Sequence, residues 1–156
     1  MKIFATFGTA KAFPRLLARL DELAQETGIE IVVQTGETPQ TAKFCKMFDY
    51  APSLTDYLKS ADLVISHAGL GSQLDLLRHH IPFVVVPRRA EFGEHNDNHQ
   101  IETCEILSRK YGIKYFLDVN EITVEFLRTP MKPYPFEETT LQLFRKNIRN
   151  ILEGGK

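Results

Sequence analysis

Residues 62–87 read DLVISHAGLGSQLDLLRHHIPFVVVP, and this stretch decides the fold. A buried strand over 63–66 leads into a glycine turn, and the turn leads into a helix over 71–79. A valine-rich strand over 83–86, bounded by Pro82 and Pro87, completes the unit. A strand, a helix and a strand in this order predict two parallel strands joined by a right-handed crossover.

The same alternation extends in both directions along the chain. An apolar strand over 2–7 ends at Gly8, a helix over 12–26 ends before Gly28, and a strand follows over 29–34. The further elements that we expect are a weak strand over 44–48, a helix over 53–60 capped by Ser53, a polar loop over 88–97, a helix over 98–111, a strand over 115–117, a helix over 121–127 and a C-terminal helix over 137–152. The pattern predicts an α/β fold with a single doubly wound, mostly parallel, Rossmann-like sheet.

Length and composition exclude several classes of protein. With 156 residues, 43% of them hydrophobic, residues 1–156 are expected to form one domain. A net charge of −1 and the absence of a long basic run argue against a nucleic-acid-binding protein. Cys45 and Cys104 are too few for a disulfide framework and are expected to be buried thiols. No signal peptide or apolar span is evident in the sequence, so we expect a cytoplasmic protein.

The glycine turn at 67–72 is the first candidate site, because ligands of doubly wound sheets bind at the carboxyl ends of strands. Gly69 and Gly71 allow the backbone to approach a ligand, and the helix N-terminus near Ser72 suits a diphosphate. Asp75, one turn further, can accept hydrogen bonds from ribose hydroxyls. The alternatives are that the glycines serve the turn alone, that Ser72 and Asp75 form a capping pair, and that His67 is a core histidine.

Gly8 and Thr9, at the end of the first strand, are a second candidate for contact with phosphate. A plain strand-to-helix turn explains them equally well. The segment Gly8-Thr9-Ala10-Lys11 lacks the G-x-G-x-x-G pattern of dinucleotide-binding proteins, and the chain has no G-x-x-x-x-G-K-[ST] motif. The sequence therefore argues against an NAD or FAD enzyme and against a P-loop protein.

The loop that follows the strand over 83–86 is the third candidate. Arg88 and Arg89 can hold a diphosphate or a carboxylate. The neutral polar groups that can read sugar hydroxyls are Asn98, His99 and Gln100. His95 and His99 are spaced to share a helix face, but no third ligand has convincing spacing, and we expect no metal. Asn98 can equally be a helix N-cap.

Together these stretches resemble the C-terminal, donor-binding half of the GT-B glycosyltransferases in the MurG-like family. The family pattern H-x-G-x-G-[ST]-x-x-E appears as the segment from His67 to Asp75, and an H-Q pair opens a helix at His99 and Gln100. His80-Ile81-Pro82 stands where the family has Gly-Lys-Pro, and Asp75 stands where it has Glu. The resemblance covers nearly the whole chain. It is greatest to the stand-alone subunits, namely the soluble subunit of the eukaryotic lipid-linked UDP-GlcNAc transferase and the PssE-type exopolysaccharide subunits.

The resemblance implies half of a GT-B enzyme that binds a UDP-sugar. The sugar, a hexose or N-acetylhexosamine, would pass to a lipid-linked acceptor in polysaccharide or glycolipid synthesis. A membrane-associated partner subunit would hold the acceptor and the general base, and no cofactor is expected. The donor-binding residues that we expect are Gly8, Thr9, His67, Gly69, Gly71, Ser72, Asp75, Arg88, His99 and Gln100.

Two other functions stay open. The chain can be a non-catalytic subunit that stabilises or activates a partner transferase, because the ribose and Gly-Lys-Pro positions are altered. A half-site of a nucleotide-sugar epimerase is a weaker alternative, since epimerisation needs acid and base groups from two domains. The apolar residues of the last helix, Leu141, Leu143, Phe144, Ile148, Ile151 and Leu152, can dock to a partner. We expect them instead to pack on the sheet of the same chain.

Overall fold

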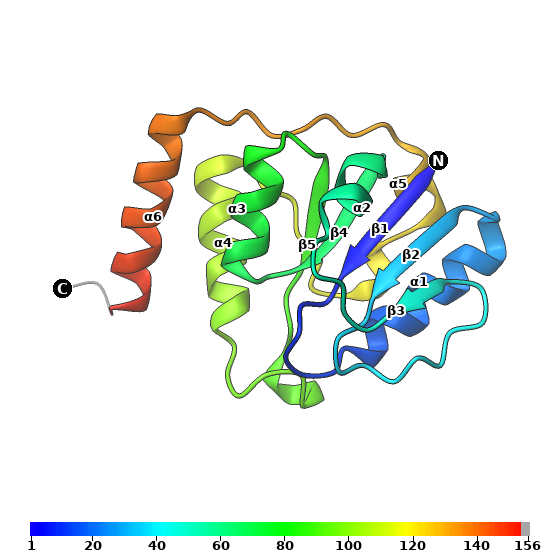
Figure 1. The fold of residues 1–156 in the computed structure, drawn as a ribbon. Coiled ribbons are helices and arrows are strands. Elements are labelled where there is room, and N and C mark those ends of the chain that lie inside the picture. The colour runs from blue at the N-terminus through cyan, green and yellow to red at the C-terminus, as the bar shows by residue number, and fades with distance from the viewer. Residues whose placement is uncertain (154–156) are drawn as a thin grey trace.

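The computed structural model describes residues 1–153, without the side chains of residues 138, 140, 144, 148, 151 and 152. Within this range the chain forms one parallel sheet whose strands lie in the order β3-β2-β1-β4-β5 (Figure 1). The strands are β1 (Lys2–Thr6), β2 (Glu30–Gln34), β3 (Lys46–Phe48), β4 (Leu63–His67) and β5 (Phe83–Val86). Every strand pair is parallel. The predicted α/β class with a doubly wound sheet is confirmed.

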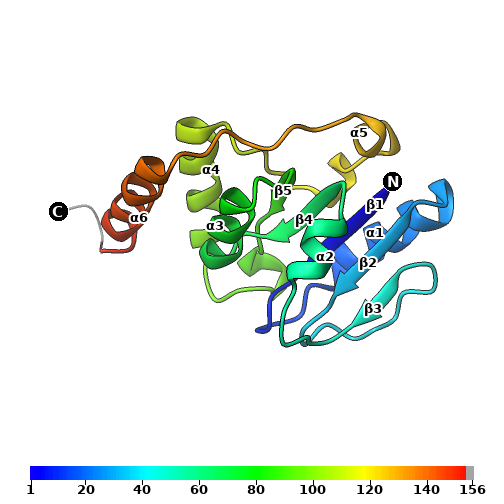
Figure 2. The same ribbon diagram turned by 45° about the horizontal axis from the view of Figure 1, so that its top comes forward.

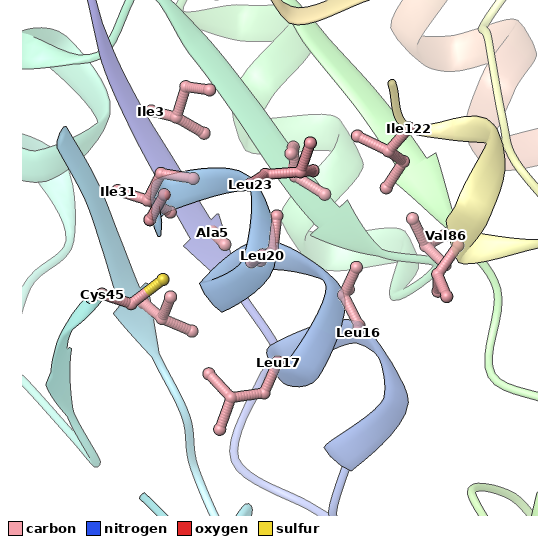
Figure 3. Close-up of a cluster of buried hydrophobic side chains, with 14 of the residues drawn as sticks. Ile3, Ala5, Leu16, Leu17, Leu20, Leu23, Ile31, Cys45, Val86 and Ile122 are labelled. Atoms are coloured by element: carbon pink, nitrogen blue, oxygen red, sulfur yellow. The ribbon is translucent and has the colours of Figure 1, made fainter. Parts of the chain in front are cut away.

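Helices cover both faces of the sheet (Figures 1 and 2). The helices that do so are α1 (Pro14–Thr27), α2 (Thr55–Ser60), α3 (Leu70–Arg78), α4 (His99–Tyr111) and α5 (Val124–Arg128), and a further helix, α6 (Glu138–Leu152), follows them. Strand residues such as Ile3 and Ala5 pack with α1 and α5 on one face (Figure 3), whereas Phe4 packs with α2, α3 and α4 on the other. Because side chains alternate along a strand, both faces are apolar, as parallel sheets require.

The strand order reverses between β1 and β4. The chain winds outward from β1 through β2 to β3, and then returns to place β4 on the other side of β1. The loops after these two central strands therefore leave the sheet in opposite directions and open a crevice at its carboxyl edge. The glycine turn at 67–72 and the segment Gly8-Thr9 both lie at this point.

The β3 strand begins two residues later than predicted, at Lys46. The carboxylate of Asp21 on α1 accepts hydrogen bonds from the backbone N–H groups of Lys43, Phe44 and Cys45, at 2.7–3.0 Å. Residues whose amides point at this carboxylate cannot pair with β2. Burial would raise the pKa of Asp21, but these hydrogen bonds outweigh it and lower the pKa.

Three further expectations are corrected. The segment 115–117 is not a strand, and only an isolated bridge joins Tyr115 to Val85. The segment 121–127 divides into a 3-10 turn over Val119–Glu121 and the short helix α5. The α2 helix begins at Thr55 with Leu54, not Ser53, at its N-cap, although the Ser53 hydroxyl accepts a hydrogen bond from the Thr55 N–H at 3.2 Å. Cys45 and Cys104 are buried, as expected.

The last helix, α6, begins at Glu138 and lies beside α4 at the end of the molecule, away from the sheet (Figures 1 and 2). Leu141 is buried, Leu143 is exposed, and the Asn147 amide donates to the Tyr111 hydroxyl at 3.2 Å. The helix therefore packs within its own chain, as expected, but against α4 and not on the sheet. The side chains of Phe144, Ile148, Ile151 and Leu152 lie outside the described residues.

His80 adopts the left-handed backbone conformation that glycine favours, with φ at 50°. It ends α3 in a Schellman-type turn, in which His80 N–H bonds to the Leu77 carbonyl and Ile81 N–H bonds to the Leu76 carbonyl, both at 3.1 Å. A side chain in this conformation costs about 1–2 kcal/mol. The turn geometry that Gly-Lys-Pro would supply is therefore kept here without the glycine.

His80→Gly is expected to stabilise the fold. The relief of the left-handed conformation outweighs the greater freedom of glycine in the unfolded chain, which leaves a net gain of up to about 1 kcal/mol. The loss of the ring contact between His80 and Phe136 reduces this gain. Urea unfolding measures it. His79→Gly is the matched control, because His79 has φ at −87°, and there glycine should destabilise.

Candidate functional site

A cavity of about 510 Å³ lies at the carboxyl ends of β1 and β4. Most of the residues that the sequence assigned to a donor site line it: Gly8, Thr9, His67, Gly69, Gly71, Ser72, Arg88 and Gln100. They come from the β1–α1 loop, the glycine turn before α3, and the loop between β5 and α4. The topology thus brings together three segments that are far apart in sequence.

His67, the last residue of β4, organises the centre of this cavity. Its Nδ1 lies 3.2 Å from the backbone oxygen of Thr6, which can accept a hydrogen bond only if Nδ1 carries the proton. Its Nε2 faces the two glycines. A Cβ atom at Gly69 would lie 2.3 Å from Nε2, and one at Gly8 would lie 2.9 Å from it. Both glycines are therefore required to make room for the imidazole.

Burial is the main reason why the pKa of His67 falls to about 4, and the positive charge of Arg88 adds to this effect. The hydrogen bond to Thr6 acts in the opposite direction. The imidazole is therefore neutral at physiological pH, and Nε2 is an acceptor. A neutral ring beside the cavity does not repel a cation and does not attract the charge of an anion.

The lowered pKa of His67 predicts a loss of stability in acid. A histidine whose pKa is lower in the folded chain stabilises the fold above its unfolded pKa of about 6.5. That contribution disappears as the pH falls from about 6.5 to about 4. The free energy of unfolding should fall by at most about 3 kcal/mol over this range. Urea unfolding at intervals across this range measures it. His67→Asn should flatten this part of the pH dependence, whereas the exposed His99→Asn should keep it.

The N-terminus of α3 is open to the cavity. Gly69 is the N-cap in an extended conformation, and no side chain caps the helix. The first N–H groups of a helix have no partner within it. A Cβ atom at Gly71 would meet no heavy atom within 4 Å, so this glycine borders open space. The alternative of a Ser72–Asp75 capping pair is wrong, because Ser72 lies inside the helix.

Arg88 is buried, with 4% of its surface exposed, and its guanidinium is held by the backbone. Its Nη2 donates to the carbonyl oxygens of Phe7 and Lys11, both at 2.7 Å. Burial lowers the pKa of Arg88, and the carboxylates of Glu94 and Glu37 oppose the change. The backbone N–H of Arg88 donates to Gln100 Oε1 at 2.8 Å, which joins both ends of the loop.

A buried ion pair fixes the rest of this loop. Glu94 accepts a hydrogen bond from Arg15 Nε at 2.7 Å and another from the Arg89 backbone N–H at 3.0 Å. Arg15 also donates to the Pro87 and Leu117 carbonyls, at 2.9 and 3.3 Å. The α1 helix therefore holds the loop that carries Arg88. The sequence offered no signal for this pair, whose members are 79 positions apart.

Two of the expected donor-site residues lie outside the cavity. The Asp75 carboxylate is 61% exposed, 3.6 Å from Arg78, and it borders a separate groove of about 290 Å³ between α2 and α3. That groove shares Thr6, Leu54 and Ser72 with the cavity, so the two spaces adjoin. The His99 ring is 66% exposed and lies near the carboxylates of Asp97 and Glu102.

The cavity also contains residues that the sequence analysis did not assign to it: Thr6, Lys11, Gln34, Tyr50 and His95. Each follows or ends a strand at the same edge of the sheet, and the strand order was the signal needed to group them. The shared helix face expected for His95 and His99 is wrong, because α4 begins at His99. Among the described residues, no group of three or more potential metal ligands occurs.

Comparison with known proteins places this arrangement in a family. Residues 3–141 match the model of the glycosyltransferase family 28 C-terminal domain. The chain belongs to this family. Within residues 1–153, no helix is long and apolar enough to span a bilayer.

Relatives by sequence include bacterial and eukaryotic transferases. Over 123 residues the chain is 28% identical to the UDP-N-acetylglucosamine–N-acetylmuramyl-(pentapeptide) pyrophosphoryl-undecaprenol N-acetylglucosamine transferase of Opitutus terrae, covering 79% of this chain and 30% of the relative. Over 127 residues it is 32% identical to the UDP-N-acetylglucosamine transferase subunit ALG13 of Mus musculus, covering 73% of this chain and 10% of the relative. The chain thus spans less than a third of either protein.

Solved structures of this fold include an NMR structure of ALG13, with a TM-score of 0.58 and 21% identity. That match covers 90% of this chain and 92% of the ALG13 chain. The crystal structure of Acinetobacter baumannii MurG matches with a TM-score of 0.56 and 18% identity, over 94% of this chain and 41% of MurG. The predicted likeness to the donor-binding half of GT-B glycosyltransferases is confirmed at the level of family and fold.

Proposed function

We propose that this chain binds a UDP-sugar and, with a second subunit, transfers the sugar to a lipid-linked acceptor. The observation that carries the proposal is the cavity at the strand-order reversal, which the uncapped N-terminus of α3 borders at Gly71 and Ser72. Unpaired N–H groups and the positive end of the helix dipole favour an anion at this place. Family membership and the names of the relatives supply the nucleotide and the class of reaction.

The two adjoining spaces suggest how the donor lies. The diphosphate occupies the centre, against Gly8, Thr9 and the first turn of α3. The ribose extends over Ser72 toward the Asp75 carboxylate in the neighbouring groove, which can accept its hydroxyl hydrogens. The exposed ring of Tyr50 and the side chain of Leu54 offer an apolar wall for the base. The sugar then lies toward Gln100.

In the proposed reaction, an acceptor hydroxyl oxygen forms a bond to the anomeric carbon of the sugar. The bond from that carbon to the β-phosphate oxygen breaks, and the electron pair leaves with UDP. The acceptor proton passes to a base that we place on the second subunit. This chain assists by stabilising the negative charge that develops on the diphosphate, through fixed N–H groups that need no reorganisation.

A thermal-shift screen with UDP, GDP, ADP and dTDP tests the donor assignment. A ligand that binds the folded state alone raises stability by mass action. We expect UDP to raise the melting temperature most. If none of these nucleotides shifts melting at millimolar concentration, the proposed donor site is refuted.

A second candidate function is a non-catalytic subunit that activates a partner transferase. The exposed positions of Asp75 and His99, outside the cavity, are the observations that favour it. A complex purified with its partner decides between the two. If Gly71→Val, which fills the space in front of α3, retains full transfer activity together with Asp75→Ala and His99→Ala, the chain is an activator, whereas a clear loss in Gly71→Val supports the donor site.

A further inference from the structure

We propose that Lys11 provides the cation that binds the donor diphosphate, and that Arg88 positions it. This inference rests on the proposed function and goes beyond it by naming a residue. The sequence indicated Arg88 as a candidate cation for the site. The contacts of the two side chains favour Lys11 as the group that meets the ligand and Arg88 as the group that holds the loop.

Arg88 is committed to the backbone through its Nη2, and its Nε is fully buried and has no hydrogen-bond partner in the described part of the chain. It is almost fully buried, and its Nη2 donates to two backbone carbonyls, those of Phe7 and Lys11. Its guanidinium carbon also lies 5.2 Å from the centre of the Phe13 ring. A ligand that took over Nη2 would have to break the bonds that shape the β1–α1 loop, and Nε is too deeply buried to be the first group that a ligand meets.

Lys11 is more accessible to a ligand than Arg88 is. It borders the cavity between the loops that follow β1 and β5, and its half-buried side chain ends in a hydrogen bond to the amide oxygen of Asn96. Asn96 is the partner of this ammonium among residues 1–153, and it carries no charge. An ammonium has three donors, so two remain for phosphate oxygens.

The backbone of Lys11 is held in a conformation that lysine rarely adopts. Its φ is 63°, in the left-handed region. Arg88 Nη2 holds its carbonyl at 2.7 Å, and the Glu37 carboxylate accepts its N–H at 3.1 Å. Strain of this kind persists only where the surrounding contacts enforce it, and it clusters at binding sites. Buried Arg88 thus fixes the loop from which the Lys11 side chain reaches the cavity.

The charges around the cavity favour an anion at Lys11. The imidazole of His67 carries no charge, and the guanidinium of Arg88 borders the cavity but is almost fully buried. Glu37 bonds to the backbone of Lys11, not to its ammonium. A diphosphate against Gly8 and Thr9 would therefore meet the Lys11 ammonium as its exposed positive group.

Calorimetry with UDP and uridine on the Lys11→Met variant tests this. Because hydrogen bonds to charged groups contribute more than neutral ones, UDP affinity should fall roughly ten- to a hundredfold. Uridine affinity should not change, since uridine has no phosphate. Lys43→Met is the matched control: Lys43 is an exposed lysine that precedes β3, at the opposite edge of the sheet, and its loss should leave UDP affinity unchanged.

Two more variants separate charge from structure. Lys11→Gly relieves the left-handed conformation, so it should lose UDP affinity while its melting temperature stays at or above that of the wild type. Asn96→Ala removes the bond to the ammonium but keeps the charge, so it should bind UDP as the wild type does. Equal UDP affinity in Lys11→Met and wild type overturns the role of Lys11, as does an equal loss in Asn96→Ala. Failure of the wild type to bind UDP refutes instead the proposed function.

Discussion

Gly71→Val is expected to abolish UDP binding, with a loss of about a hundredfold or more, while the chain stays folded. The added side chain would occupy the space in front of the first turn of α3, where no heavy atom lies within 4 Å of a Cβ atom. Two hydrogen bonds from backbone N–H groups to a charged phosphate are worth about 3 kcal/mol or more together. Helical propensity does not suffer, since valine forms helices better than glycine does.

Calorimetry with UDP and urea unfolding, on the same preparations, measure both parts of this prediction. Gly71→Ala is the graded control, because a single methyl group enters the same space and should weaken binding less. Gly69→Ala is unsuitable, since its Cβ atom would collide with the His67 ring and disturb the fold itself. Undiminished UDP affinity in Gly71→Val would show that phosphate does not lie at this turn.

The sequence predicted the sheet and its helices because their signals are local. Runs of β-branched residues such as 83–86 and helices with one apolar face can be recognised within a short window. The left-handed glycine that ends α1, Gly28, is equally local, and its φ is 67°. One error, the start of β3, arose where a distant side chain intervened. The carboxylate of Asp21 removes Phe44 and Cys45 from β3, and no local pattern reveals that contact.

The sequence predicted which segments form the site, but not which side chains of those segments face the ligand. The glycines of 67–72 and Gly8-Thr9 could be placed at one edge because parallel strands end together. Whether a polar side chain faces the cavity or the backbone depends on atoms from other loops. Arg88 illustrates this, since its partners are carbonyls of residues 77 and 81 positions away in the sequence. Lys11 was overlooked because a lysine in a loop resembles any solvated residue.

The ion pair between Arg15 and Glu94 should be the most sensitive point of the loop after β5. Glu94→Gln is expected to cost about 3 kcal/mol of folding free energy, because it leaves a half-buried guanidinium without its carboxylate. That is a large share of the roughly 5–15 kcal/mol by which a domain is stable. Only 2% of the Glu94 surface is exposed, so water cannot replace the lost partner.

Urea unfolding compares this variant with Glu22→Gln, which breaks the more exposed pair of Arg19 and Glu22 and should cost less than about 1 kcal/mol.

The double variant Arg15→Met with Glu94→Leu removes both charges and should recover much of the loss, since apolar groups can replace a buried pair. It should not recover UDP affinity to the same degree. The Arg15 bond to the Pro87 carbonyl and the Glu94 bond to the Arg89 N–H both hold the loop that carries Arg88. A double variant that regains stability and full UDP affinity would show that the pair supports the fold but does not position the site.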